Sequence, residues 1–187
     1  MRLILLRHGK TEANERRLYC GSSDLPLCDA GRAELRGFCA ERRIDAAGLV
    51  RITSGMRRTD ETLRLLFDAA PDRIETGFRE IDFGAFEMLD YNQLKSDAVY
   101  QNWIADETGE IAPPGGESAN AFRARVIAAA ERLTEDSLIV THGGVIAALM
   151  EYWFPEEGKN RWDWQPDCGC GYEVRLSGAD RSYKPIN

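Results

Sequence analysis

The sequence lacks any long hydrophobic run. Its first apolar stretch covers only residues 3–6 and is followed at once by Arg7 and His8, which makes it too short for the apolar region of a signal peptide. No stretch reaches the roughly 20 apolar residues that a membrane-spanning helix needs. We therefore expect a cytoplasmic protein that has no membrane partner.

Positive charge is also scarce. The chain has 24 Lys and Arg residues against 31 Asp and Glu residues, which gives a formal net charge of −7. Such a chain does not attract nucleic acid or an anionic lipid surface, so neither is expected as a partner. A small anion can still bind where a few arginines converge.

Cysteine is infrequent and its count is odd. An odd number without a secretory signal argues against a disulfide framework. Cys168-Gly169-Cys170 could supply half of a metal site, but no second Cys/His pair stands at a suitable spacing. We expect free thiols and no metal site. The five cysteines are Cys20, Cys28, Cys39, Cys168 and Cys170.

The remaining pattern is that of one α/β domain. With 187 residues, of which 43% are hydrophobic, the chain suits a single core. Short apolar segments that read as strands alternate with amphipathic segments that read as helices, which predicts a three-layer α/β/α sandwich with a mostly parallel central sheet. Strands are expected at residues 2–7, 49–53, 73–76, 137–141 and 172–176, and helices at 29–43, 57–70, 118–133 and 144–153.

Residues 85–115 depart from this alternation. They contain an aromatic-rich helical portion at 91–103, and they end in the break Pro113-Pro114-Gly115-Gly116. The pieces on either side are too small for separate cores. We therefore interpret residues 1–187 as one domain in which 85–115 form a lid or cap, and the next helix is capped by Ser118 or Asn120.

The two histidines occupy equivalent places. His8 follows the strand at 2–7, His142 follows the strand at 137–141, and a glycine comes directly after each. A single histidine is more often a packing or surface residue, but two at the ends of parallel strands would meet at one edge of the sheet. A metal-dependent hydrolase is a weaker interpretation, because carboxylate ligands are lacking and the nearby arginines oppose a cation.

Arginines stand near the ends of two of the expected strands. Arg7 adjoins His8, and Arg57 and Arg58 begin the helix expected after the strand at 49–53. A helix N-terminus attracts anions, and the planar guanidinium group suits phosphate oxygens. Together these features predict a phosphate site.

Five segments, in order, resemble the signature of the histidine phosphatases, or phosphoglycerate mutase-like superfamily. A lone Arg-His-Gly would be a weak match, whereas the ordered set is specific. The segments are Arg7-His8-Gly9-Lys10-Thr11-Glu12-Ala13-Asn14, Ser54-Gly55-Met56-Arg57-Arg58-Thr59-Asp60-Glu61-Thr62, Phe78-Arg79-Glu80-Ile81-Asp82-Phe83-Gly84, Pro114-Gly115-Gly116-Glu117-Ser118 and Thr141-His142-Gly143-Gly144.

The resemblance implies a role for each matching residue. His8 would be the phosphorylated nucleophile, its second ring nitrogen held by a backbone carbonyl, and Glu80 would be the proton donor, with Asp82 as the fallback acid. Arg58 rather than Arg57 falls in register with the family's arginine. Arg7, Arg58 and His142 would hold the phosphate, and the substrate-binding residues would be Asn14, Thr11 and Gly143. No metal or cofactor is implied.

Within the superfamily, the chain is similar to the alpha-ribazole phosphatases. Glu87-Met88 follows the acid segment as it does in that group, while Phe86 and Lys10 depart from common family residues. The similarity implies hydrolysis of alpha-ribazole 5'-phosphate, a small-molecule phosphate ester, with a homodimer left open. Alternatives are a broad-specificity or sugar-phosphate phosphatase, a phosphoglycerate mutase and a non-catalytic phospho-ligand binding module.

Overall fold

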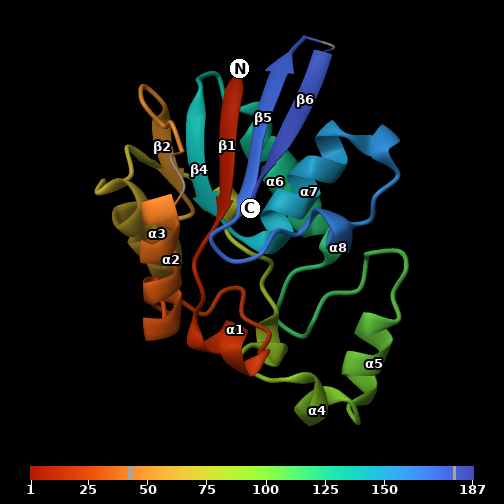
Figure 1. Cartoon of the computed structure of the whole chain (residues 1–187). Coiled ribbons are helices and arrows are strands. Elements are labelled where there is room, and N and C mark those ends of the chain that lie inside the picture. Colours follow the sequence, from red (N-terminus) through yellow and green to blue (C-terminus); the bar gives the residue numbers. More distant parts are fainter. Residues whose placement is uncertain (42–43, 179) are drawn as a thin grey trace.

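The computed structural model describes residues 1–41, 44–178 and 180–187, of which 39–41 are described by their backbone alone (Figure 1). Among these residues, the strands form one sheet in the order β3-β2-β4-β1-β5-β6. The strands are β1 (Arg2–Arg7), β2 (Val50–Thr53), β3 (Arg73–Ile74), β4 (Ser137–Thr141), β5 (Gly171–Ser177) and β6 (Asp180–Ile186).

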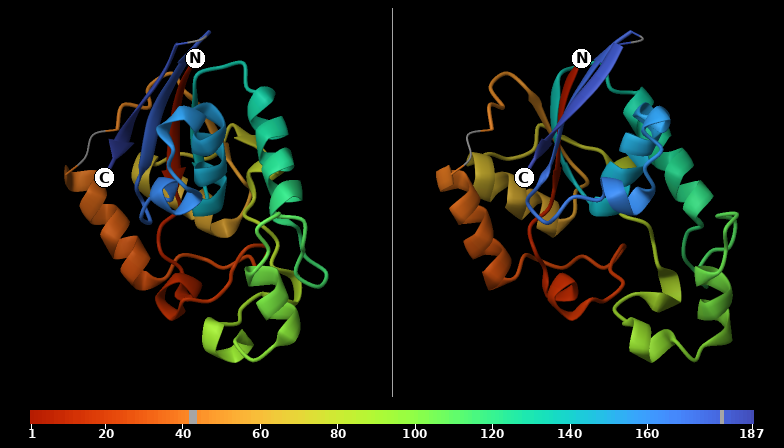
Figure 2. Two further views of the ribbon diagram at one scale, coloured as in Figure 1. Left: turned by 90° about the vertical axis from the view of Figure 1, so that its right-hand side faces the viewer. Right: turned by 45° about the vertical axis from the view of Figure 1, so that its right-hand side comes forward.

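The helices lie on both faces of this sheet, so the expected three-layer α/β/α sandwich is confirmed. Figure 2 shows α2 and α3 on one side of the strands and α6 and α7 on the other. The α-helices are α1 (Glu12–Arg16), α2 (Asp29–Glu41), α3 (Arg57–Phe67), α4 (Tyr91–Leu94), α5 (Ala98–Ile104), α6 (Ala119–Glu131), α7 (Gly143–Trp153) and α8 (Arg161–Trp164), and the short 3₁₀ turns are η1 (Thr76–Phe78), η2 (Gly84–Phe86) and η3 (Pro155–Glu157).

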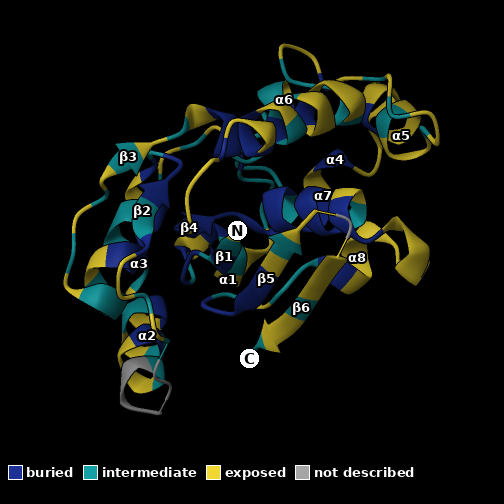
Figure 3. Ribbon diagram, turned by 90° about the horizontal axis from the view of Figure 1, so that it is seen from above, coloured by how far each residue is buried: buried dark blue, intermediate teal, exposed yellow. Residues whose placement is uncertain are grey.

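Alternate side chains of β1 pack into the two cores. Leu3 and Leu5 belong to the cluster formed with α6 and α7. Ile4 and Leu6 belong to the cluster formed with α3. Because successive residues of a strand face opposite sides, a central strand covered on both faces reads as a continuous apolar run. Figure 3 shows β1, β4 and much of α7 as buried and β6 as mostly exposed.

The sheet register brings three strand ends together. β4 pairs in parallel with both β1 and β2, so that Val140 is the partner of Leu6 on one side and of Thr53 on the other. β3 is parallel to β2, whereas β5 is antiparallel to β1 and β6 antiparallel to β5. The residues that follow β1, β2 and β4 therefore emerge side by side at one edge, as expected for His8 and His142.

Several expected boundaries shift for local reasons. α3 ends at Phe67 and not near residue 70, because Asp68 adopts φ +48° and its N–H bonds the Arg64 carbonyl. Of the two capping candidates for α6, Ser118 accepts a hydrogen bond from Ala121 N at 3.2 Å. The expected helix end at Arg43 lies outside the described residues.

The region of the expected cap contains two helices. Asp97 caps α5 separately, so the aromatic-rich portion divides into α4 and α5. Phe86, Leu94 and Tyr100 form a small core there, against which Tyr19 and Trp103 pack. Figure 1 shows α1, α4 and α5 at the end of the sheet where β1 and β4 end. Closure of this segment as a lid stays a prediction.

None of the helices in the described ranges is long and apolar enough to cross a membrane.

Candidate active site

The two histidine rings meet at the ends of β1 and β4. Their centroids lie 5.2 Å apart with an interplanar angle of 65°. His8 is 6% exposed and His142 is fully buried. Burial first, and then the positive charge of Arg58, lowers the pKa of each imidazole well below its ordinary value of 6.5. Both rings are therefore neutral near pH 7.

One tautomer of His8 is selected by the backbone. Nδ1 lies 2.7 Å from the carbonyl oxygen of Gly9. Since a carbonyl only accepts, Nδ1 carries the proton and Nε2 keeps its lone pair. The loop is held by two further bonds, from His8 N to Thr141 O at 2.9 Å and from Gly9 N to the hydroxyl of Thr62 at 2.9 Å. His8 thus presents a neutral nitrogen in a fixed direction.

Arg58 lies next to His142 at the start of α3. Its side chain is buried, and Nε donates to His142 Nδ1 at 3.2 Å. Because Nδ1 accepts, Nε2 of His142 carries the ring proton and donates to Ser54 Oγ at 2.8 Å. Arg57, by contrast, is exposed. Arg58 is thus the member of the Arg57-Arg58 pair that the structure brings into the cluster.

Two backbone carbonyls complete the surroundings of Arg58. Nη1 donates to Ser23 O and Nη2 donates to Gly21 O, each at 2.8 Å. Burial lowers the pKa of this guanidinium group. Sequence reasoning did not identify the loop at 21–23, because no charged side chain in it marks the contact.

Arg7 approaches the histidines from the end of β1. Nη1 donates to Pro166 O at 2.8 Å, and the backbone N–H of Arg7 donates to Cys170 O at 2.9 Å. Its Nε is buried and has no hydrogen-bond partner among the described residues. Leaving a buried donor unpaired costs about 1–3 kcal/mol. A ligand oxygen at this position would satisfy it.

Glu80 lies at the N-terminus of α7. Oε2 accepts from Gly144 N at 3.0 Å, and Oε1 accepts from Ile81 N at 3.0 Å. A Cβ on Gly144 would come within 2.4 Å of Glu80 Oε1, so only glycine permits this approach. Asp82 is engaged elsewhere, since its Oδ1 accepts from Ser22 Oγ and Gly84 N, each at 2.9 Å.

Thr11 and Asn14 form a capping box at the start of α1. Asn14 Oδ1 accepts from both the N–H and the hydroxyl of Thr11, each at 3.0 Å. The amide NH₂ of Asn14 remains a donor, which suits the role expected for it. The hydroxyl of Thr11 supports the helix start, and its contact with a substrate stays a proposal.

Gly143 begins α7 directly after His142. A Cβ at this position would lie 2.5 Å from Nε2 of Gln165, so the Gln165 amide packs against the helix start. No motif marks Gln165 in the sequence.

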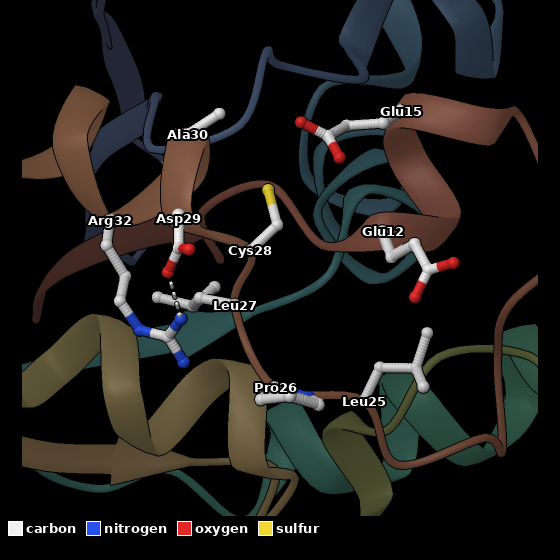
Figure 4. Close-up of a pocket in the computed structure, with 9 residues that line it drawn as sticks. All are labelled: Glu12, Glu15, Leu25, Pro26, Leu27, Cys28, Asp29, Ala30 and Arg32. Atoms are coloured by element: carbon white, nitrogen blue, oxygen red, sulfur yellow. Dashed lines mark hydrogen bonds and ion pairs between the residues drawn. The ribbon is translucent and has the colours of Figure 1, made fainter.

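A separate hollow of about 420 Å³ lies beside α1 (Figure 4). None of the proposed catalytic or substrate-binding residues lines it. Arg32 at its edge pairs with Asp29 at 3.3 Å. The lining residues are Glu12, Glu15, Leu25, Pro26, Leu27, Cys28, Asp29, Ala30 and Arg32.

Within the described ranges, no group of three or more His, Cys, Asp or Glu side chains could hold a metal ion. Cys168 is half-buried and Cys170 is buried.

The chain is similar to known proteins along its whole length. The profile of the histidine phosphatase superfamily (branch 1) matches residues 3–187. The adenosylcobalamin/alpha-ribazole phosphatases of Salmonella typhimurium and Escherichia coli K12 are 29% and 31% identical, over 100% of this chain and 96% of each relative. The alpha-ribazole phosphatase structure from Shigella flexneri gives a TM-score of 0.87 at 28% identity, covering 100% of this chain and 96% of that one. A phosphoglycerate mutase structure from Thermus thermophilus gives 0.78 at 29%, covering 100% and 99%.

Proposed function

Because this chain belongs to branch 1 of the histidine phosphatase superfamily and is a phosphatase, we propose that it hydrolyses phosphate monoesters through a phosphohistidine formed on His8. The observation that carries the mechanism is the bond between His8 Nδ1 and Gly9 O at 2.7 Å. It leaves the lone pair on Nε2, which is the atom that attacks phosphorus.

In the first step, a bond forms between His8 Nε2 and phosphorus while the bond from phosphorus to the ester oxygen breaks. The leaving oxygen takes its proton from Glu80. In the second step, a water molecule attacks phosphorus, Glu80 accepts a proton from it, and the bond to His8 Nε2 breaks. Splitting one displacement into two in this way is the usual benefit of a covalent intermediate.

The charges around His8 suit a phosphoryl group. Arg58 and Arg7 supply guanidinium N–H donors, and Arg7 Nε is buried without a partner among the residues that the structure describes. Preorganised donors of this kind stabilise the charge on the transferred group without reorganising during the reaction. The geometry therefore supports phosphoryl transfer that depends on arginines.

For the substrate, we propose alpha-ribazole 5'-phosphate. The support is the full-length similarity to two adenosylcobalamin/alpha-ribazole phosphatases. Tyr19, Phe83 and Trp103 are partly buried, with ring centroids 5.1–6.0 Å apart. The accessible parts of these rings could contact a flat heterocycle. Tyr100, at 1% exposure, lies inside the cap core and is not part of such a surface.

The test is phosphate release, with a metal chelator present, from alpha-ribazole 5'-phosphate, several sugar phosphates and 3-phosphoglycerate. We expect the ribazole ester to give the highest kcat/KM. Similar or higher values on sugar phosphates would favour a broad-specificity phosphatase. Transfer of phosphate between positions of 3-phosphoglycerate would favour a mutase. Release of a single equivalent per chain would instead indicate a binding module.

A further inference from the structure

We propose that Glu87 is a positioning residue of the phosphate site, which it serves through the loop at 21–23 and Arg58. The proposal rests on the phosphate-binding role proposed above for Arg58. Glu87 follows the acid segment in the chain, and none of its hydrogen bonds is to His8 or Glu80. Its effect is transmitted through backbone groups.

The carboxylate of Glu87 accepts hydrogen bonds from the backbone N–H groups of the loop at 21–23. Oε1 accepts from Gly21 N at 2.9 Å and from Ser22 N at 3.0 Å. Oε2 accepts from Ser23 N at 3.2 Å and from Ser23 Oγ at 2.6 Å. Three successive backbone N–H groups thus converge on one anion, an arrangement that fixes the conformation of a loop.

A fourth backbone group ties this carboxylate to its own segment. Phe83 N donates to Glu87 Oε1 at 3.1 Å. No salt bridge involving Glu87 occurs among the residues that the structure describes. Its negative charge is therefore met by these N–H dipoles and, at longer range, by the Arg58 cation, and the hydrogen bonds are charge-assisted.

The same loop holds Arg58 with its carbonyl groups. Gly21 O and Ser23 O accept from Nη2 and Nη1 of Arg58, each at 2.8 Å. Gly21 packs so tightly on the backbone of Ile81 that a Cβ would lie 1.6 Å from the Ile81 carbonyl oxygen, so this contact blocks any movement of the loop toward Ile81. Glu87 therefore binds the N–H groups, and Arg58 the carbonyl groups, of one short peptide segment.

The contacts of Arg58 leave a defined set of donors for phosphate. A guanidinium group has five N–H bonds. Nε is used by His142, and Nη1 and Nη2 each give one N–H to the loop. One N–H on each terminal nitrogen remains, and both are charged donors that suit phosphate oxygens. The loop thereby sets the direction of both free donors.

Glu87→Gln is the first test. The Gln amide places an NH₂ group against N–H or O–H donors of the loop, so the loop must move and turn Arg58 with it. We expect inorganic phosphate to bind on the order of 10- to 100-fold more weakly by calorimetry, with a similar loss in kcat/KM for p-nitrophenyl phosphate, since small misplacements have effects of this size.

A double-mutant cycle separates this role from a general loss of stability. If Glu87 acts through Arg58, then adding Glu87→Gln to Arg58→Ala lowers kcat/KM by less than about twofold, because the interacting pair is not additive. Ser23→Ala is the second variant, to be used if the Gln variant does not fold. It removes the bond at 2.6 Å and should weaken phosphate binding in the same direction.

Glu173→Gln is the matched control. This carboxylate is 6% exposed and bonds Arg2 at 3.1 Å and Lys184 at 2.9 Å. These contacts lie at the start of β1, whereas the phosphate site lies at its end. The control should lower the thermal midpoint and leave phosphate affinity unchanged. Unchanged phosphate affinity in Glu87→Gln, or a full additional loss in the Arg58→Ala background, would overturn the proposal. If Glu87→Gln weakens phosphate binding but the wild-type protein hydrolyses no ester, the phosphatase proposal alone would be overturned.

Discussion

Arg58 Nε donates to His142 Nδ1 across 3.2 Å, and neither side chain is more than 1% exposed. This contact needs a neutral imidazole, because a protonated ring would set one N–H against another. A cation and a titratable base are thus packed together in a site from which water is largely excluded. The pair holds the guanidinium group in place and also makes the fold sensitive to acid.

The first prediction concerns stability against pH. In the unfolded chain both histidines bind protons below about pH 6.5, whereas burial and the Arg58 cation keep them neutral in the folded chain to well below that value. The unfolded state therefore binds more protons, and the free energy of unfolding falls as pH decreases. We expect the slope to steepen below pH 6.5 and to approach about 1.4 kcal/mol per pH unit for each histidine, measured by urea unfolding at about pH 7, 6 and 5.

This pH window lies above the range in which the carboxyl groups stabilised by ion pairs affect stability. The carboxyl pKa values lowered by ion pairs, to about 2 at Asp72 beside Arg51 and at Glu173 beside Arg2, act only at lower pH. His142→Gln should reduce the slope by about half, because one of the two titrating groups is gone. Equal slopes for the wild type and this variant would show that His142 is not held neutral.

The second prediction concerns the nucleophile. His8→Asn keeps a side chain of similar polarity but has no nitrogen that can attack phosphorus. Turnover should fall on the order of 10⁴-fold or more, as when other covalent nucleophiles are removed. Acid-quenched samples should contain no phosphoenzyme, while binding of inorganic phosphate is retained. A phosphoenzyme of normal yield would place the covalent step on another residue.

The third prediction concerns Glu80 as the acid. Glu80→Gln should slow phosphoenzyme formation about 10²- to 10⁴-fold for an alkyl ester, whose leaving oxygen needs a proton. For p-nitrophenyl phosphate the loss should be much smaller, because the leaving oxygen is already stable. Rapid-quench kinetics on both esters gives the comparison. Equal losses would argue for Asp82 or for a purely structural role of Glu80.

The fourth prediction concerns Arg125 on α6. Nη1 donates to the carbonyls of Gly77 and Arg79, each at 2.9 Å, and Nη2 pairs with Glu117 at 2.7 Å. These bonds hold the segment that presents Glu80. Arg125→Gln should lower kcat for poor leaving groups about tenfold, because the acid is misplaced.

The control for this variant is Arg123→Gln on the same helix. Arg123 is exposed and pairs with Glu151 at 3.2 Å, away from the acid segment. It should leave turnover unchanged. If both variants lose activity equally, α6 stability rather than the position of Glu80 is responsible.

Local sequence patterns were sufficient for the central strands and for the proximity of His8, His142 and Arg58. β1 and β4 read as short apolar runs because helices cover both of their faces, and the parallel register then places His8 beside His142. The family motif separated Arg58 from Arg57, and only the former is buried. These features depend on residues that are neighbours in the chain or on the regular register of parallel strands.

Other features depend on contacts between distant segments and could not be read from the sequence. β6 was missed, because its residues do not alternate between apolar and polar and Pro185 interrupts it. The partners of Glu87 in the loop at 21–23 lie more than 60 residues earlier in the chain. Which tryptophans are buried could also be seen only in the structure. Trp153 and Trp164 are in the core, whereas Trp162 is 71% exposed.

The position of β6 at the edge of the sheet bears on how the protein behaves when concentrated. An open edge strand can recruit the same strand of another molecule and so begin a fibril. Here the edge carries Asp180, Arg181 and Lys184, and Pro185 has no N–H to offer to an incoming strand. The residues that hid this strand from sequence reasoning are those that protect the sheet from polymerising, so replacing Pro185 and Lys184 with valine should produce a chain that aggregates on storage.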